Sequence, residues 1–308
     1  IREPLSPGAY VEYSVDDQPG VVERARAYLA GAPCEPVAPR RAATVMLVSE
    51  GKPHYRRFES PLAGGAPIEE TVDAAPVDVF MLRRASTMAF TPDAVVFPGG
   101  GMDARDVECA VPWAGPSPEQ WARLMSCTEP EARGIITAAA REVFEESGVL
   151  LASAPGGAAP IDERGDHWAC EREAVATRQI SFGEFLRERG LVLRSDLMRL
   201  RSHWVTPESE ARRYDTYFFL ARLPEGQHSD GRTSEAVEAA WIAPGEALMR
   251  FDAGLLKLVP PTISNLTSIV AATSVDEAWN TPFDGHVRPH PVARACGEVV
   301  LGCEVSET

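Results

Sequence analysis

The sequence lacks the features that mark membrane, secreted and nucleic-acid-binding proteins. It has no apolar run long enough to span a bilayer. Its first residues, IREPLSPGAY, lack the basic and apolar regions of a secretory signal. The formal net charge is −15, whereas nucleic-acid binding requires clustered Lys and Arg. We therefore expect a cytoplasmic protein that has no nucleic-acid or membrane partner. A small anionic substrate remains compatible with this charge if a metal and local arginines offset the field.

Paired cysteines and internal repeats are also lacking. The cysteines are scattered and form no C-x-x-C pair, which favours reduced thiols over a disulfide framework or a zinc site. They are Cys34, Cys109, Cys127, Cys170, Cys296 and Cys303. The 308 residues, of which 44% are hydrophobic, suffice for one large domain or one domain with additions. No feature of the sequence indicates an oligomeric state.

The order of the expected elements indicates an α+β fold. Strands are predicted at residues 41–50, 77–85, 94–100, 212–223 and 238–244. Helices are predicted at 19–31, 117–125, 129–148, 244–254 and 260–279. A helical layer is predicted at 166–178, 181–190 and 194–202. Strands and helices in this order predict an α+β or layered α/β/α domain rather than a regular parallel array.

The segment REVFEESGV (141–149) carries three carboxylates on one face of a predicted helix. With Glu142 at zero on a helical wheel, Glu145 falls at about −60° and Glu146 at about +40°. The opposite side of the same helix is apolar and can pack on a core; it comprises Ile136, Ala140, Val143 and Phe144. Arg141 lies beside the carboxylates, where it can orient one of them by hydrogen bonding.

Three adjacent carboxylates repel one another, and a hard divalent cation removes that conflict. Oxygen ligands suit Mg²⁺, with substrate phosphates completing the shell. The alternative is a solvated acidic helix face, as Glu and Arg runs commonly form. Two features favour the cation. The helix ends in Ser-Gly-Val, and a glycine turn containing Gly99 and Gly100 precedes it, which can offer backbone N–H groups to phosphate.

These residues resemble the Nudix box, G-x5-E-x7-R-E-U-x-E-E-x-G-U, where U is aliphatic. Arg141 to Val149 match the fixed positions of its second half, and Gly100 matches its opening glycine. The resemblance implies a mixed β-sheet sandwiched between helices, and hydrolysis of a diphosphate linked to another moiety. It also implies that Glu142, Glu145 and Glu146 hold the metal, Mg²⁺ or Mn²⁺, and that Arg141 orients a carboxylate.

The box is split by an insertion at about residues 103–130. Counting back from Arg141, the first box Glu falls at Arg133; counting forward from Gly100, it falls at Asp106. Only the forward count offers a carboxylate. An insertion of this kind is tolerated as a surface excursion, because loop length costs stability only logarithmically. Its Trp113 and Trp121 either line a pocket or belong to the core.

Residues 80–106 are similar to the Nudix branch that contains eukaryotic peroxisomal coenzyme A diphosphatases, which also interrupts the box. Residues 203–221 and 260–266 resemble later segments of that branch, although Asp93 stands where the branch commonly has glycine. The implied substrate is coenzyme A or acyl-coenzyme A. Nucleotide sugars, ADP-ribose and dinucleotides are the alternatives within the same chemistry. A non-catalytic nucleotide-binding module is the alternative outside it.

Other charged residues have two interpretations each. Arg83 and Arg84 end a strand before the glycine turn and either contact substrate phosphates or form a solvated strand end. Many Nudix enzymes take a further metal ligand or general base from about the place of Glu235 and Glu238. The alternative there is a charged loop.

Three segments are predicted from these observations. Residues 1–40 form a lead-in with one helix, and residues 41–275 form the Nudix domain with insertions at about 103–130 and 155–200. Residues 276–308 form a Pro-rich tail with weak structural signals.

Overall fold

The computed structural model describes most of the chain. The described residues are 3–16, 18–33, 35–51, 75–87, 91–108, 111–157, 168–231, 233 and 236–307. No helix within these ranges is long and apolar enough to cross a membrane. Cys34, Cys109 and Glu235 lie outside them, and the other four cysteines are free.

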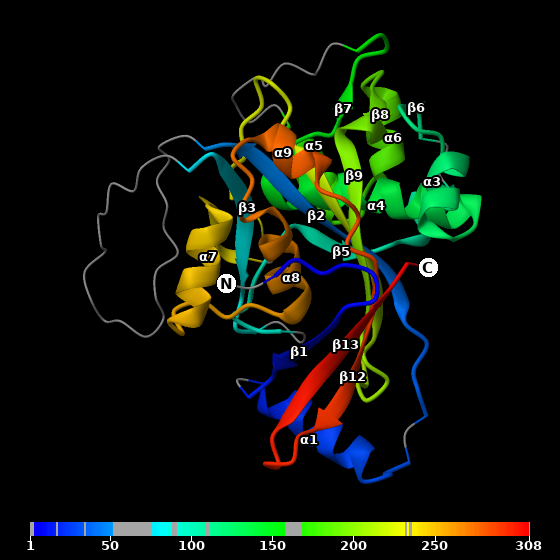
Figure 1. Ribbon diagram of the computed structural model, residues 1–308. Coiled ribbons are helices and arrows are strands. Elements are labelled where there is room, and N and C mark those ends of the chain that lie inside the picture. Colours follow the sequence, from blue (N-terminus) through cyan, green and yellow to red (C-terminus); the bar gives the residue numbers. More distant parts are fainter. Residues whose placement is uncertain are drawn as a thin grey trace.

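A large mixed sheet crosses the molecule (Figure 1). Its main path within the described ranges is β1-β13-β12-β9-β10-β2-β3-β11, with β4 on β3 and β5 on β2; a small second sheet has the order β6-β8-β7. The strands are β1 (Tyr10–Ser14), β2 (Arg40–Glu50), β3 (Val77–Arg84), β4 (Val95–Val96), β5 (Gly99–Gly101), β6 (Trp113–Ala114), β7 (Ala152–Ser153), β8 (Val192–Arg194), β9 (Met198–Val205), β10 (Tyr214–Arg222), β11 (Ala236–Ile242), β12 (His286–Ala293) and β13 (Val299–Ser306).

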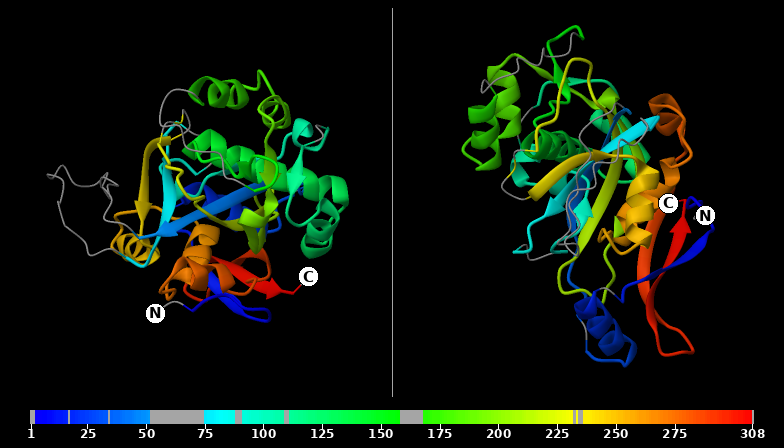
Figure 2. Two further views of the ribbon diagram at one scale, coloured as in Figure 1. Left: turned by 90° about the horizontal axis from the view of Figure 1, so that it is seen from above. Right: turned by 90° about the vertical axis from the view of Figure 1, so that its left-hand side faces the viewer.

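Helices cover both faces of this sheet. They are α1 (Pro19–Leu29), α2 (Ala104–Glu108), α3 (Pro118–Met125), α4 (Glu129–Ser147), α5 (Ala169–Ala176), α6 (Phe182–Glu188), α7 (Pro244–Asp252), α8 (Pro260–Ile269) and α9 (Val275–Asn280). In the left view of Figure 2 the green helices, α4 among them, lie on one side of the sheet and the gold and orange helices on the other. The predicted mixed sheet between helices is confirmed.

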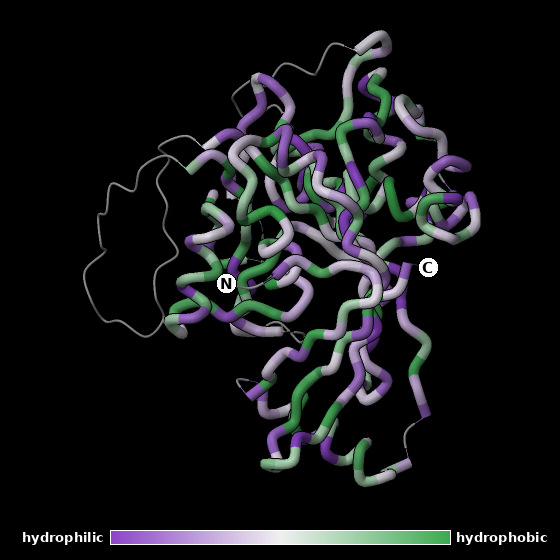
Figure 3. The backbone as a smooth tube through the Cα atoms, viewed as in Figure 1, coloured by the Kyte–Doolittle hydropathy of each residue, from purple (hydrophilic) through white to green (hydrophobic). Residues whose placement is uncertain are grey.

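The two faces of the sheet have separate cores because side chains alternate along β2. Ala43, Val45 and Leu47 are buried on the side of α3, α4, α5 and α6. Met46 and Val48 are buried on the side of α7, α8 and α9. Figure 3 shows the hydrophobic stretches of the strands and of the helices that flank them. Burial on both faces explains why this run reads as almost continuously apolar.

The helix predicted at residues 194–202 is wrong. A short 3-10 turn at Ser195–Leu197 leads into β9, which pairs with β10 and β12. The spacing of Leu197, Met198 and Leu200 fits a helix as well as a strand. Sheet pairing decides the outcome, because tertiary contacts override weak local preference.

The C-terminal residues, whose sequence signals are weak, contain two long strands. β12 and β13 form a hairpin, and β13 pairs with β1 of the lead-in. Pro289 and Pro291 lie within β12, beyond its two register pairs with β9. Proline is tolerated there because that stretch lacks β9 as a neighbour on one edge. The lead-in and the tail thus extend the central sheet, and their boundaries as separate segments stay a prediction.

The first insertion is more than a surface excursion. Trp121 is 3% exposed and packs edge-to-face on Phe219 of β10, with ring centroids 5.8 Å apart. The Tyr217 hydroxyl donates to the carbonyl of Met125 at 3.2 Å. Trp113 packs at the margin of the same core. The core interpretation is therefore confirmed for Trp121, whereas Trp113 is only partly buried.

A pair of buried histidines joins the C-terminal hairpin to the central sheet. His286 of β12 lies opposite His203 of β9, and their Nδ1 atoms are 2.6 Å apart. His203 also contacts Asp215 through Nε2, and Arg41 donates to the other oxygen of Asp215 at 2.5 Å. At this distance one Nδ1 donates a hydrogen bond and the other accepts it.

Burial, with the charges of His203 and Arg288 adding to it and that of Asp215 opposing it, lowers the pKa of His286 to about 4. An unfolded histidine titrates at about 6.5. As the pH falls through that window, the unfolded chain binds a proton that the folded chain does not, so His286 makes folding less favourable. Asp284 acts in the opposite direction, because burial raises its pKa to about 7 against the charge of Arg201.

We predict that wild type loses more stability than His286→Asn between pH 6.5 and pH 4, because the substitution removes the titrating ring and leaves Asp284 in place. Urea unfolding midpoints at pH 7, 5 and 4 measure this difference. His290 is exposed on the same strand, so His290→Asn should follow wild type. Parallel pH profiles for wild type and His286→Asn would contradict the role of the histidine pair.

Candidate active site

Helix α4 carries the predicted carboxylates, and both of its ends are fixed locally. Thr128 caps its start: its hydroxyl accepts from the Glu131 N–H, and the Glu131 carboxylate accepts from the Thr128 N–H. Gly148 ends it in a left-handed conformation with a φ of 75°. The predicted helix and its glycine stop are confirmed. Glu142 and Glu146 are buried, and Glu145 is partly exposed.

The glycine strand β5 lies directly against these carboxylates. β5 pairs antiparallel with β2, which places Gly100 opposite Ala43. A Cβ on Gly100 would lie 2.4 Å from Oε1 of Glu142, and one on Gly99 would lie 2.6 Å from the carbonyl oxygen of Ala43. Any larger residue would displace a neighbour at either place. The glycines are therefore required by close approach rather than by a turn.

The Gly99 N–H donates to Oε2 of Glu146 at 2.9 Å. The sequence suggested that backbone N–H groups of this turn face a phosphate. In the structure this N–H holds a carboxylate instead, so Gly99 connects β5 to α4.

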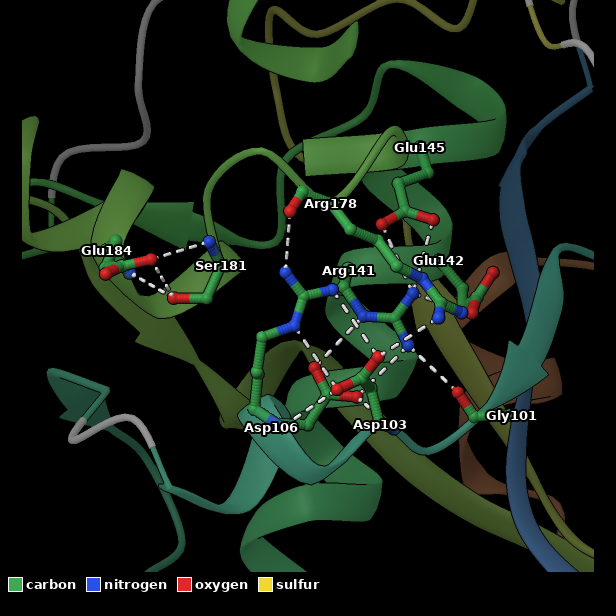
Figure 4. Close-up of polar contacts among 10 residues, drawn as sticks. Gly101, Asp103, Asp106, Arg141, Glu142, Glu145, Arg178, Ser181 and Glu184 are labelled. Carbon is green, nitrogen blue, oxygen red and sulfur yellow. Dashed lines mark hydrogen bonds and ion pairs between the residues drawn. The ribbon is translucent and has the colours of Figure 1, made fainter. Parts of the chain in front are cut away.

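Arg141 lies at the centre of the carboxylates. Its Nη1 donates to Glu142 at 2.8 Å and to both oxygens of Glu145 at 3.2 Å. Its Nη2 also donates to the carbonyl oxygen of Gly101 at 3.0 Å. Figure 4 shows Asp106, Glu142 and Glu145 around this guanidinium. Arg141 can therefore orient Glu142 and Glu145, as the sequence predicted.

Asp106 closes the ring of contacts from the opposite side. Asp106 lies on helix α2 and is 3% exposed. Its two carboxylate oxygens accept hydrogen bonds from Nε of Arg141 at 3.0 Å and from Nη2 at 3.1 Å. This bidentate pairing is the strongest geometry available to an arginine and a carboxylate. The forward count from Gly100 therefore gives the residue that contacts Arg141. The backward count gives Arg133, which pairs with Glu129 near the helix start.

The carboxylates around Arg141 determine the pKa of its guanidinium. Burial alone lowers the pKa of Arg141, but the charges of Glu142, Asp106 and Glu145 outweigh burial and raise that pKa above its ordinary value. The guanidinium therefore stays charged over the whole range in which a protein is folded. Without it, buried carboxylates would face one another unpaired.

The donor set consists of carboxylate oxygens, which fit a hard cation such as Mg²⁺. In this arrangement the carboxylates are turned to Arg141 and to Gly99, and the described part of the chain contains no group of three His, Cys, Asp or Glu side chains placed to hold a metal. The metal role of Glu142, Glu145 and Glu146 stays a prediction. A cation would have to draw them away from Arg141.

Arg83 and Arg84 lie at the end of β3. Arg83 is 7% exposed and its Nε donates to Glu238 of β11 at 3.0 Å. The Nε of Arg84 is buried with no hydrogen-bond partner among the atoms described. The structure thus pairs Arg83 with Glu238, while a role of either arginine in binding phosphate stays a prediction. Asp93, which stands at a common glycine position, adopts a φ of 61°. It keeps a glycine-like backbone there because Asp tolerates this region.

Sequence reasoning missed three residues beside the site. Asp103 donates its N–H to Asp106 at 2.8 Å and forms ion pairs with Arg105 and Arg178. Arg178 comes from the loop between α5 and α6, far from the box in sequence. No motif marks it, because its place depends on how the second insertion folds back over α4.

Comparisons with known proteins agree with this geometry. Residues 122–269 match the family model of the NUDT19 Nudix domain. The chain is 30% identical over 282 residues to the acyl-coenzyme A diphosphatase NUDT19 of Gallus gallus, covering 77% of this chain and 70% of that protein. It is 28% identical over 273 residues to the Homo sapiens protein of that name, covering 77% and 70%.

A solved structure extends the likeness to the fold. A Nudix hydrolase from Alicyclobacillus acidocaldarius is 25% identical with a TM-score of 0.62, and the match covers 81% of this chain and 99% of that one. The chain belongs to the Nudix hydrolase family and is an enzyme that acts on diphosphate bonds.

We predict that Gly100→Ala lowers kcat/KM by about 100-fold or more, because the added methyl group displaces the Glu142 carboxylate and small misplacements in a site are costly. Gly101→Ala is the matched control, since a Cβ there meets nothing within 4 Å. The substitution also keeps the backbone carbonyl that accepts from Arg141. Steady-state kinetics on both variants, with thermal melting, measure the effect. Equal activity of the two variants would show that Glu142 does not need this position.

Proposed function

We propose that this enzyme hydrolyses the diphosphate bond of coenzyme A or an acyl-coenzyme A in the presence of a divalent cation, Mg²⁺ or Mn²⁺. One observation carries the proposal: Glu142, Glu145 and Asp106 gather around Arg141 beside a glycine strand that also holds Glu146. Similarity to proteins named acyl-coenzyme A diphosphatase supports the substrate class.

The cation would be held by Glu142, Glu145 and Glu146. When bound, it would neutralise part of their charge and stabilise negative charge that develops on phosphoryl oxygens. The chain itself supplies the positions. Arg141 orients Glu142 and Glu145, and Gly100 leaves the space that the Glu142 carboxylate fills.

The remaining predicted residues have supporting roles in this proposal. Arg83 and Arg84 would contact substrate phosphates from the end of β3. Glu238, which already pairs with Arg83, would act as a further ligand or base once a phosphate competes for that arginine. Glu235 lies outside the described residues.

The second candidate is cleavage of ADP-ribose, a nucleotide sugar or a dinucleotide. The carboxylate site suits any of these diphosphates, because the bond to be cleaved is the same. A non-catalytic nucleotide-binding module is disfavoured, since the box carboxylates of α4 are all present. The proposed partner is therefore a small nucleoside diphosphate derivative.

We predict that Glu145→Gln and Glu146→Gln each lower kcat by about 100-fold or more while melting as wild type does, because each loses a charge that would bind the cation. Glu129→Gln is the control: this residue lies on the same helix and is 53% exposed in its side chain. Excess chelator should abolish turnover, and added Mg²⁺ or Mn²⁺ should restore it. Full turnover in chelator would refute the metal requirement.

We predict that coenzyme A and acyl-coenzyme A give the highest kcat/KM in a panel that also contains ADP-ribose, a nucleotide sugar and a dinucleotide. Product masses should show an adenosine bisphosphate and a phosphopantetheine fragment, as cleavage of the diphosphate requires. A higher kcat/KM for ADP-ribose would assign the second candidate instead.

A further inference from the structure

Arg178 occupies a backbone conformation that favours glycine. It follows Thr177, the C-cap residue of α5, and has a φ of 62°. This is the position after a helix where glycine is usual, because a side chain there crowds the backbone. Its N–H still donates to the carbonyl of Val175 at 2.9 Å. A glycine could make that bond without strain, so helix termination does not explain the arginine.

The side chain of Arg178 points to the carboxylate site. Its Nη1 lies 3.5 Å from an oxygen of Asp103, and Asp103 in turn donates its N–H to Asp106, the partner of Arg141. In Figure 4 the side chain extends from its loop toward Arg141 and the acidic residues. The carbonyl of Arg178 accepts from Nη1 of Arg105 at 3.0 Å, which fixes the loop over α2.

The arginines that converge here differ in exposure. Arg141 is 12% exposed and binds four partners, and Arg105 is 36% exposed and contacts Asp103 and the Arg178 carbonyl. Arg178 is 73% exposed, with its ion pair to Asp103 at 3.5 Å. An exposed pair of this kind contributes little to stability. Stability therefore does not account for an arginine in a strained position.

We propose that Arg178 binds a phosphate group of the substrate and that Asp103 holds its guanidinium toward the site until substrate arrives. The inference rests on the proposed function and deepens it. The substrate is a polyanion, the chain has a net charge of −15, and the site itself is rich in carboxylates. An exposed guanidinium beside these carboxylates adds attraction for the polyanion, and its fork of donors matches phosphate oxygens.

Three substitutions separate charge from backbone. Arg178→Gly removes the guanidinium, relieves the left-handed strain and keeps the carbonyl that Arg105 uses. Arg178→Lys keeps the charge, and Arg178→Gln removes it while keeping a polar side chain at the left-handed position. We expect Arg178→Gly and Arg178→Gln to raise KM about tenfold with kcat within about twofold of wild type, and Arg178→Lys to lie between. Arg178→Gly should melt no lower than wild type.

Arg123→Gln is the matched control. This arginine is 68% exposed on α3 of the first insertion and pairs with Glu119 on its own helix. Its loss should leave KM unchanged.

The choice of substrates identifies which phosphate is bound. Coenzyme A, its 3′-dephospho form and ADP-ribose share the diphosphate, but only coenzyme A carries the 3′-phosphate. A rise in KM for all of them places Arg178 on the diphosphate, and a rise for coenzyme A alone places it on the 3′-phosphate. Unchanged KM values in folded Arg178→Gly for every substrate would overturn the proposal.

Binding without turnover separates this inference from the proposed function. If wild type hydrolyses none of these compounds, the proposed function fails, and calorimetric dissociation constants for coenzyme A still test Arg178. A weaker constant for Arg178→Gly than for wild type supports phosphate binding. Equal constants, or no binding by wild type, overturn it.

Discussion

The burial of several carboxylates beside one another depends on the guanidinium of Arg141. Asp106 and Glu142 are 3% and 9% exposed, and removing an unpaired carboxylate from water costs several kcal/mol. Arg141 pairs with Asp106 and Glu142 and also reaches Glu145. The position of α4 against β5 follows from this pairing and from the absence of any side chain on Gly100. The acidic site can therefore remain assembled before a cation or substrate arrives.

The same interaction gives the first insertion its structural role. The glycine strand and α4 are separated in sequence by α2, β6 and α3. Asp106 on α2 rejoins them by its bidentate pair with Arg141, while Trp121 on α3 anchors the excursion in the core. The insertion is thus held near its start by the ion pair of Asp106 and toward its end by the packing of Trp121. Its length is tolerated because these anchors, rather than chain connectivity, set the distance between the two parts of the box.

Patterns in the sequence predicted the elements that have strong local signals. The stop at Gly148 and the apolar run of β2 are each encoded within a few residues. The carboxylate face of α4 follows from helical spacing alone. Counting from Gly100 identifies Asp106 as a candidate. Its contact with Arg141 could not be predicted, because it depends on where α2 lies in the fold.

Elements that depend on distant partners could not be predicted. β9 has an ambiguous spacing and becomes a strand because β10 and β12 flank it. β12 contains prolines and is stabilised by β13, including the pair Pro289 and Cys303. Arg178 has no local sequence signature, because its position beside the site depends on an ion pair with Asp103, which lies just before α2. In each of these cases the information lies in a pairing rather than in a segment.

The pairing of β1 with β13 sets an order for the folding of the chain. Tyr10 lies opposite Glu304 and Ser14 opposite Val300, so β1 cannot pair until β13, which lies far later in the chain, has been synthesised. β10 and β11 carry no such requirement, because the strands that they pair with, β2, β3 and β9, precede them in the chain. The edge formed by β1, β13 and β12 should therefore assemble late, because contacts between residues far apart in sequence form slowly. During translation β1 would therefore remain without its partner strand until β13 has emerged.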